Sequence, residues 1–332
     1  MIASRYRDQV AAALAAATVR GPTRYAWLGR MSRRLPLSVD AELDDDERRR
    51  YLASCLREEL YFSFYCHGGP VPARWGAPEP VSADHGFLEA LSRANTGHGT
   101  WEPGWTVEHV EGEEAVVATP RLRVRVAVSD CHAAAGAVHE GDSVSVHLPS
   151  ELPSLSPGFF TVLGDASDDG ASDAGDVRVY WNVMQAGAPA LVAMLTSRLN
   201  AEGVPYRFKI ADHPFRLDRC DAAILYLDGE VFRSLRAALR EQAAALAAHL
   251  RPSIPAFTLE LAPGVGLAED DAGESFGYRR CAPLAEAIVD AHERGIRRIE
   301  DRVEVVAARF AEDGVRIDAP YLEPSLDGRH VL

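Results

Sequence analysis

Of the 35 basic residues in the chain, 34 are arginines and one, Lys209, is a lysine. An arginine in a protein cannot release its proton, whereas a partly desolvated lysine can act as a base or a nucleophile. A codon bias toward arginine that happened to spare a surface lysine is the plainest alternative. It does not explain why Lys209 stands among aromatic residues on a short predicted strand. Lys209 is therefore the first candidate for a chemical role.

Polar residues occupy one face of each of two predicted strands, 177–183 and 204–210. Side chains alternate along a strand, and a strand covered by helices is apolar on both faces. The two polar faces hold Arg178, Tyr180, Asn182, Arg207 and Lys209. If the faces align, they form a basic pocket in an acidic protein, suited to a phosphate or a carboxylate. An equally weighted alternative is a solvated sheet edge whose arginines pair with Asp218 and Asp221.

The segment that follows the second strand adds candidates to this pocket. Residues 212–221 contain His213, Arg216 and Arg219. A histidine titrates near neutral pH, so His213 is a candidate acid, and a plain loop histidine before a proline is equally favoured. His98 lies between two glycines and is a further candidate for lining a pocket, against the more common surface histidine.

Other motifs are weaker. The letters Gly273-Glu-Ser275-Phe-Gly277 match the nucleophile elbow of esterases, but an acidic stretch separates them from the preceding strand. Because an elbow follows directly on a strand, an esterase built on Ser275 ranks third among the functions considered. The sequence has no Walker loop, no HExxH and no kinase motif, and its histidines lack metal-ligand spacing. We predict no metal site.

The periodicity of apolar residues predicts an α+β fold. We expect an N-terminal helical region over 1–66, whose clearest helix is 44–65, and antiparallel strands in the middle of the chain. The C-terminal part is expected to form a mixed sheet with flanking helices. Within it, strand 177–183, helix 188–201 and strand 204–210 should form a right-handed βαβ unit with parallel strands.

These elements divide the chain into four predicted parts. They are a mainly helical region (1–104), an antiparallel β section (105–163), an acidic flexible loop (164–176) and an α/β catalytic core (177–332). The loop is Asp- and Gly-rich and cannot be buried, so it either joins two lobes or decorates one continuous domain.

The composition excludes several classes of protein. With 35 basic and 49 acidic residues, the formal net charge is −14, which argues against a nucleic-acid partner. No stretch approaches the ~20 apolar residues of a membrane span, and the N-terminus lacks the apolar core of a signal peptide. Five cysteines with no CxxC pair indicate reduced thiols. We therefore expect a cytoplasmic protein without a membrane partner.

Several segments around the candidate pocket resemble the HopA-type effector family. They are Arg178-Val-Tyr-Trp-Asn182, Leu199-Asn200, Tyr206-Arg-Phe-Lys209, Arg219-Cys-Asp221-Ala-Ala-Ile-Leu-Tyr226, Leu261-Ala-Pro-Gly-Val-Gly-Leu-Ala-Glu269 and Glu274-Ser-Phe-Gly277 through to Arg280. The resemblance covers about 175–285, and it extends only loosely to the loop at 95–105.

Relatives of the effector that are encoded in peptide natural-product clusters act as the stand-alone lyases of class V lanthipeptide and thioamitide pathways. There, a separate kinase phosphorylates Ser or Thr of a precursor peptide, and the lyase removes phosphate to leave dehydroalanine or dehydrobutyrine. The resemblance thus implies a metal-independent phospho-Ser/Thr lyase that needs no cofactor. Its partners would be the phosphorylated precursor, with leader and core, and a Ser/Thr kinase.

The resemblance also suggests roles for the candidate residues, because Lys209 occupies the family's lysine position. Like charge and desolvation should lower the pKa of such a lysine, as a general base requires. The general acid would be His213, with Tyr180 and Asn182 as alternative donors. The phosphate ligands would be Arg207, Arg216 and Arg219, then Arg178 and Arg280, with His98 at the pocket wall. The effector member is best regarded as an interaction protein, so the alternative function is a non-catalytic module that binds a phosphorylated or acidic ligand.

Overall fold

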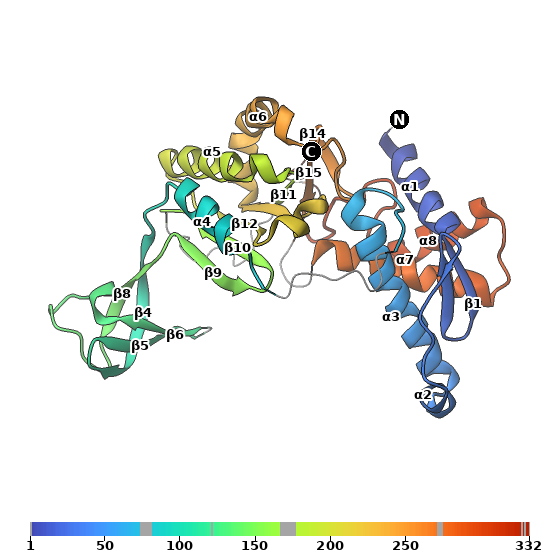
Figure 1. Ribbon diagram of the computed structural model, residues 1–332, viewed down its shortest axis with the longest axis horizontal. Coiled ribbons are helices and arrows are strands. Elements are labelled where there is room, and N and C mark those ends of the chain that lie inside the picture. The colour runs from blue at the N-terminus through green and yellow to red at the C-terminus, as the bar shows by residue number, and fades with distance from the viewer. Residues whose placement is uncertain are drawn as a thin grey trace.

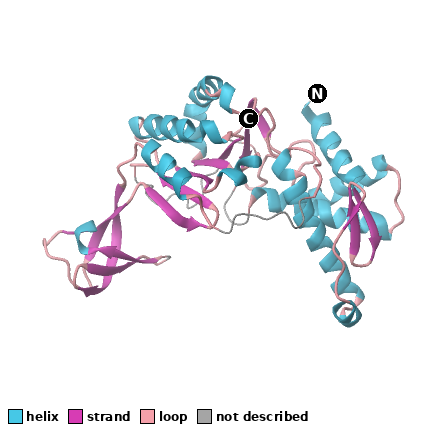
Figure 2. Cartoon of the chain, viewed as in Figure 1, coloured by secondary structure: helices cyan, strands magenta, loops and turns pink. Residues whose placement is uncertain are grey.

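The structure is a computed structural model and shows three antiparallel sheets with helices packed around them (Figures 1 and 2). It describes residues 2–73, 82–120, 122–166, 177–270, 275–326, 328 and 330–331. Most of the predicted acidic loop, residues 167–176, lies outside these ranges. The predicted α+β class is confirmed.

A seven-stranded sheet forms the centre of the molecule. Its strands, in spatial order, are β14 (Leu259–Ala262), β15 (Val265–Glu269), β11 (Val177–Trp181), β13 (Ala223–Leu227), β12 (Arg207–Ala211), β10 (Phe159–Leu163) and β9 (Glu151–Ser156). Every neighbouring pair is antiparallel. Each residue of β11, β13 and β15 is buried, as expected for strands whose two faces are both covered.

The sequence predicted a mixed sheet in which two parallel strands are neighbours, and the order of the strands in the structure differs from this. β11 and β12 do run parallel to each other and are joined by helix α5 (Ala188–Ala201), but β13 lies between them and pairs antiparallel with both. The result is a split βαβ unit. The physical reason is that β13 is apolar on both faces, and a central position buries both of them.

The N-terminal lobe combines segments from both ends of the chain (Figure 1). Helices α1 (Ile2–Ala16), α3 (Asp45–Ser63), α7 (Phe276–Glu293) and α8 (Ile299–Glu312) pack on one another. Beside them, residues 17–31 form the short strands β1 (Ala17–Gly21), β2 (Arg24–Trp27) and β3 (Arg30–Met31), where a helical region was expected. The β-branched Thr18 and Val19, with a Gly-Pro turn after them, favour a hairpin there over a continued helix.

Helix α3 is important because it carries aromatic residues to the central sheet. A capping box starts it: the Glu47 amide donates to Asp44 Oδ1 at 2.7 Å, and the Asp44 amide donates to Glu47 Oε2 at 2.9 Å. Leu52, Leu56 and Leu60 are buried at four-residue spacing, as predicted. This buried stripe fixes the rotation of the helix and thereby the direction of its last turn.

Two further helices lie beside the central sheet: α4 (His85–Ala94) packs on α5, and α6 (Gly229–Ala245) contacts β14. The short helix α2 (Leu37–Glu42) lies at the far end of α3, away from this sheet (Figure 1). None of the helices in the described ranges combines the length and the apolar character that crossing a membrane requires. The five cysteines are free thiols.

A second sheet projects away from the rest of the molecule (Figure 1). In spatial order its strands are β6 (Arg123–Ala127), β5 (Glu114–Ala118), β4 (Thr100–Glu111), β8 (Ser143–Leu148) and β7 (Cys131–Ala133). It has its own small core, which includes Trp105, Val117 and Val146. The antiparallel strands predicted for this part of the chain from a two-residue period are confirmed.

Candidate functional site

A cavity of about 590 Å³ lies where α3 and the start of α7 meet one face of the central sheet. Its walls combine cationic, aromatic and a few other side chains: Tyr61, Phe62, Tyr65, Phe159, Arg178, Tyr180, Arg207, Lys209, Arg219, Asp221, Ile224, Tyr226, Ser275 and Tyr278. Four of these residues are Lys or Arg and one is acidic, so the cavity is basic although the whole chain carries a net charge of −14.

The register of the sheet explains why the predicted residues meet here. Tyr226 of β13 pairs with Arg178 of β11 on one side and with Arg207 of β12 on the other. Two residues earlier on β13, Ile224 pairs in the same way with Tyr180 of β11 and Lys209 of β12. Because paired residues project on the same face, two rows of side chains point into the cavity. Sequence patterning grouped four of these six residues and missed the two that β13 supplies.

The Tyr226 ring is the centre of a cluster of cations. The guanidinium carbon of Arg207 lies 4.4 Å from the ring centroid, that of Arg178 lies 5.3 Å away, and Lys209 Nζ lies 5.4 Å away. Lys209 Nζ is also 4.7 Å from the centroid of the Phe159 ring. Such contacts hold a cation without neutralising it. Among the described residues, neither Arg207 nor Lys209 forms an ion pair, so their charges are available to a ligand.

Arg178 differs from these two cations, because it is buried against a carboxylate. Its guanidinium forms an ion pair with Asp270, a fully buried residue that also pairs with Arg279. Arg279 in turn pairs with Glu323 at 2.9 Å. Arg178 is therefore anchored next to the Tyr226 ring by a structural network, with part of its charge already compensated.

Arg219 is fixed by a second buried carboxylate, Asp221. Arg219 Nε and Nη2 each donate to Asp221 at 2.8 Å, and Nη2 also donates to the Tyr61 hydroxyl at 2.9 Å. The Tyr61 hydroxyl donates to Asp221 Oδ2 at 3.1 Å. Burial alone would raise the pKa of the Asp221 carboxyl, but the Arg219 charge and these hydrogen bonds hold the pKa below its ordinary value. The guanidinium is thus held in one orientation at the cavity wall.

Two tyrosines at the base of the cavity are hydrogen-bond donors. Burial raises the pKa of Tyr180 and of Tyr65 above the ordinary value, and Arg178 only partly offsets this at Tyr180. Both hydroxyls are therefore protonated at neutral pH. Tyr180 belongs to the same row across the sheet as Lys209. A donor thus lies on the same cavity face as the candidate base.

Two predicted residues after β12 lie outside this cavity. The ring of His213 caps the short 3-10 helix Pro214–Asp218, since its Nδ1 accepts from the Phe215 amide at 3.1 Å. Arg216 forms an ion pair with Asp212 and lines a neighbouring cavity. The sequence placed both residues close to Lys209, but the chain turns away from the cavity after β12 ends at Ala211.

Three more of the predicted site residues do not line this cavity. Asn182 follows the end of β11, so the alternation no longer applies, and its amide donates to the Ser253 carbonyl at 2.9 Å. Arg280 is buried and donates to the carbonyls of Pro320 and Leu322 at 2.7 and 2.9 Å. The His98 side chain is 89% exposed and pairs with Asp165 at 3.3 Å. The cavity is built without these three.

Sequence reasoning missed the aromatic wall of the cavity. The run Tyr61-Phe-Ser-Phe-Tyr65 at the end of a charged helix was its signal, because so many aromatic side chains need a surface to pack on. Tyr61 stacks on Tyr278 with 4.0 Å between the ring centroids. Ser275 is also at this wall, directly before α7, whereas Gly273 and Glu274 of the elbow-like motif lie outside the described residues.

Comparison with known proteins identifies relatives of this chain. Residues 150–322 match the model of the HopA1 effector protein family. An effector protein from Pseudomonas syringae pv. tomato strain DC3000 is 17% identical with a TM-score of 0.36, over 52% of this chain and 66% of its own. One from Pseudomonas syringae pv. syringae strain 61 is 21% identical with a TM-score of 0.37, over 50% and 62%. Less than two thirds of either effector is thus covered. No curated protein matches the chain.

Proposed function

The chain belongs to the HopA1 effector protein family, and from that premise we propose that it is a lyase for phosphoserine and phosphothreonine residues of a ribosomal precursor peptide. One observation carries the proposal. Lys209, the chain's only lysine, faces a cavity that it shares with Arg178, Arg207 and Arg219. A candidate base is thus held among groups suited to phosphate, which is the combination that elimination of phosphate requires.

In the proposed reaction, the side-chain amine of Lys209 removes the α-proton of the phosphorylated residue. The electron pair of that C–H bond becomes the Cα=Cβ double bond, while the Cβ–O bond breaks and phosphate leaves with its electron pair. The products are dehydroalanine or dehydrobutyrine and inorganic phosphate. Arg207 and Arg219 stabilise the charge on the departing phosphate, and Arg178 lines the same cavity.

The Tyr180 hydroxyl is the best-placed donor for the enolate that develops when the α-proton leaves. It is protonated at neutral pH because burial raises its pKa, and it shares a face with Lys209. A preorganised donor at such a point stabilises the transition state more than the ground state. We therefore assign the role of proton donor to Tyr180, whereas the sequence analysis named His213 as the first candidate.

The proposed substrate must come from a phosphorylating reaction, so we propose a separate Ser/Thr kinase as the partner that supplies it. The dehydro residues formed are electrophiles for later ring-forming steps of a lanthipeptide-type or thioamitide natural product. The alternative function is a binding module that holds a phosphorylated or acidic ligand in the same cavity without chemistry. It is favoured by the description of the whole family as effectors.

Incubation of the purified protein with a phosphoserine peptide, and separately with a carboxylic ester, distinguishes these functions. A lyase releases phosphoric acid from the peptide and leaves a dehydroalanine residue that adds a thiol, as mass spectrometry detects. A binding module leaves both compounds unchanged, and an esterase acting through Ser275 would cleave only the carboxylic ester. If no dehydro residue forms from a phosphopeptide that carries its own leader, with the kinase present, the lyase proposal fails.

Replacing Arg207 by Ala is expected to weaken phosphopeptide binding by about tenfold or more, because a charge-assisted hydrogen bond contributes ~1.5–3 kcal/mol. Arg207 has no ion pair among the described residues, so the midpoint of urea unfolding should hardly change. Arg280 is the matched control. Its loss would leave the buried carbonyls of Pro320 and Leu322 without donors. Arg280→Ala should therefore lower stability and spare binding in the folded fraction; the reverse pattern would remove Arg207 from the site.

Replacing His213 by Gln is expected to leave the rate of elimination within about twofold of wild type. The His213 ring caps a short helix and does not line the cavity. A glutamine oxygen can accept the same amide hydrogen bond, so the fold should be retained. Initial rates over the pH range of about 5–8, in which a histidine changes charge, provide the measurement. A large drop in rate without loss of folded protein would restore His213 as the general acid.

A further inference from the structure

A second, larger cavity of about 800 Å³ lies next to the cationic one. It opens between α3 with the N-terminal hairpin on one side and the 3-10 helix Pro214–Asp218 on the other. Phe62, Phe159 and Arg219 line both cavities. The two spaces therefore meet at these three side chains, and Arg219 is within reach of a molecule in either one.

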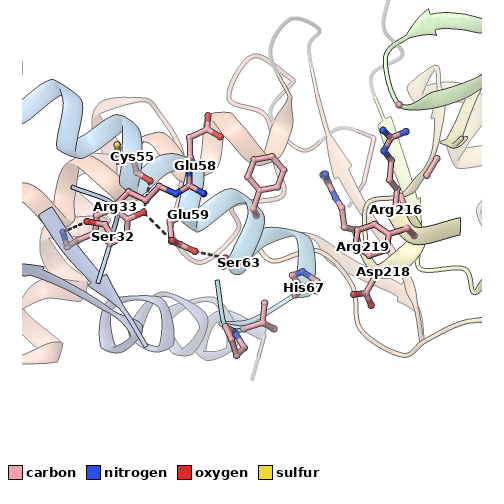
Figure 3. A pocket seen from close by; sticks show the side chains of 18 of the residues that line it. Ser32, Arg33, Cys55, Glu58, Glu59, Ser63, His67, Arg216, Asp218 and Arg219 are labelled. Carbon is pink, nitrogen blue, oxygen red and sulfur yellow. Dashed lines mark hydrogen bonds between the residues drawn. The ribbon is translucent and has the colours of Figure 1, made fainter. Parts of the chain in front are cut away.

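The two walls of this second cavity carry different polar groups (Figure 3). Glu58, Glu59 and Ser63 come from α3, while Arg216, Asp218 and Arg219 come from the opposite wall. Carboxylates and hydroxyl oxygens accept hydrogen bonds, and guanidinium groups donate them. A peptide backbone offers an N–H and a C=O at nearly every residue, so it can use both walls.

Two large aromatic residues also line this cavity from opposite sides. Phe62 on α3 and Phe215 on the 3-10 helix are each 44% exposed. Half-exposed phenylalanines that line one concave surface are typical of sites that bind an apolar group. Pro72, Pro157 and Ala211 extend this apolar lining between the charged groups.

We propose that this second cavity binds the segment of the precursor peptide that flanks the phosphorylated residue. The phosphoester enters the cationic cavity past Phe62, Phe159 and Arg219, and an apolar side chain of the flanking segment lies between Phe62 and Phe215. The inference rests on the proposed function and adds a specificity site to it. A single phosphoserine would fill only the smaller cavity, whereas spaces of about 590 and 800 Å³ together exceed the size of a typical small-molecule pocket.

The test measures binding with probes that cannot react. In them a methylene group replaces the ester oxygen of phosphoserine, so no phosphate can leave. One probe is the single blocked phosphonate residue, and the other is a peptide extended on both sides with leucine next to the phosphonate. Calorimetry with wild type, Phe215→Ala and Trp101→Ala gives the affinities. Trp101 is a 49% exposed aromatic residue of β4 outside both cavities, and it controls for the loss of an exposed ring.

The wild type should bind the extended peptide more tightly than the single residue. Phe215→Ala should weaken the extended peptide by about fivefold or more, as expected for an aromatic contact in a binding site, and leave the single residue unaffected. Trp101→Ala should change neither affinity. Equal affinity of the two probes, no binding of the extended peptide, or equal loss of both in Phe215→Ala would overturn the inference. Elimination is measured separately with the phosphoserine peptide, so its absence would refute the lyase function without altering the binding result.

Discussion

Replacing Lys209 by Arg is expected to lower the rate of phosphate elimination by at least about a hundredfold, while phosphopeptide affinity stays within about threefold of wild type. The substitution keeps the positive charge and much of the side-chain length, but an arginine cannot accept a proton at neutral pH. Lys209 is half-buried and contacts the rings of Phe159 and Tyr226. Because a guanidinium also packs well on aromatic rings, the fold should tolerate the change.

Formation of dehydroalanine, followed by mass under single-turnover conditions, gives the rate, and calorimetry with a phosphonate peptide gives the affinity. A second variant provides the control. Lys209→Ala should regain part of its activity when a small primary amine is added, because the amine can enter the vacated space and take the proton. If Lys209→Arg retains substantial activity, Lys209 serves to bind phosphate and the base assignment is wrong.

Replacing Asp221 by Asn is expected to lower the free energy of unfolding by about 3 kcal/mol at pH 7, because removing one partner of a buried ion pair leaves the other uncompensated. Asp221 is 3% exposed and accepts hydrogen bonds from both Arg219 and Tyr61. Arg219 would lose its fixed orientation, so phosphopeptide binding should weaken as well. Urea unfolding measures the stability. Asp8→Asn, at an exposed carboxylate on α1, is the control, and it should change stability by less than about 0.5 kcal/mol.

The pH dependence distinguishes this ion pair from a packing effect. The Asp221 pKa is lower in the folded protein than its ordinary value, so the ionised carboxylate stabilises the fold. That stabilisation is complete above the unfolded pKa of about 3.9 and is lost as the pH falls through the folded pKa. The difference in stability between wild type and Asp221→Asn should therefore shrink below about pH 4. A difference that stays constant from neutral pH into this acidic range would show that the charge of Asp221 contributes little.

Local patterns in the sequence predicted most of the elements around the cavity. Helix 188–201 was predicted with the ends that it has, and the polar faces of the strands around Arg178, Tyr180, Arg207 and Lys209 do point into one cavity. These features depend on residues two to four positions apart, so they can be recognised in the sequence without knowledge of the fold. The hairpin at 17–31 was missed because its strands are short and follow an alanine-rich helix.

The sequence by itself determined which chemical groups are present: one lysine, the arginines near it and the strand faces that carry them. Only the tertiary structure decided which of them share a cavity. β13 enters between β11 and β12 and adds Tyr226, while α3 brings Tyr61 to Arg219 from 158 residues away. Arg280 and His213 instead satisfy backbone groups elsewhere. The physical reason is that strand order and the pairing of buried charges follow from packing apolar faces across the whole chain, which no short stretch of sequence encodes.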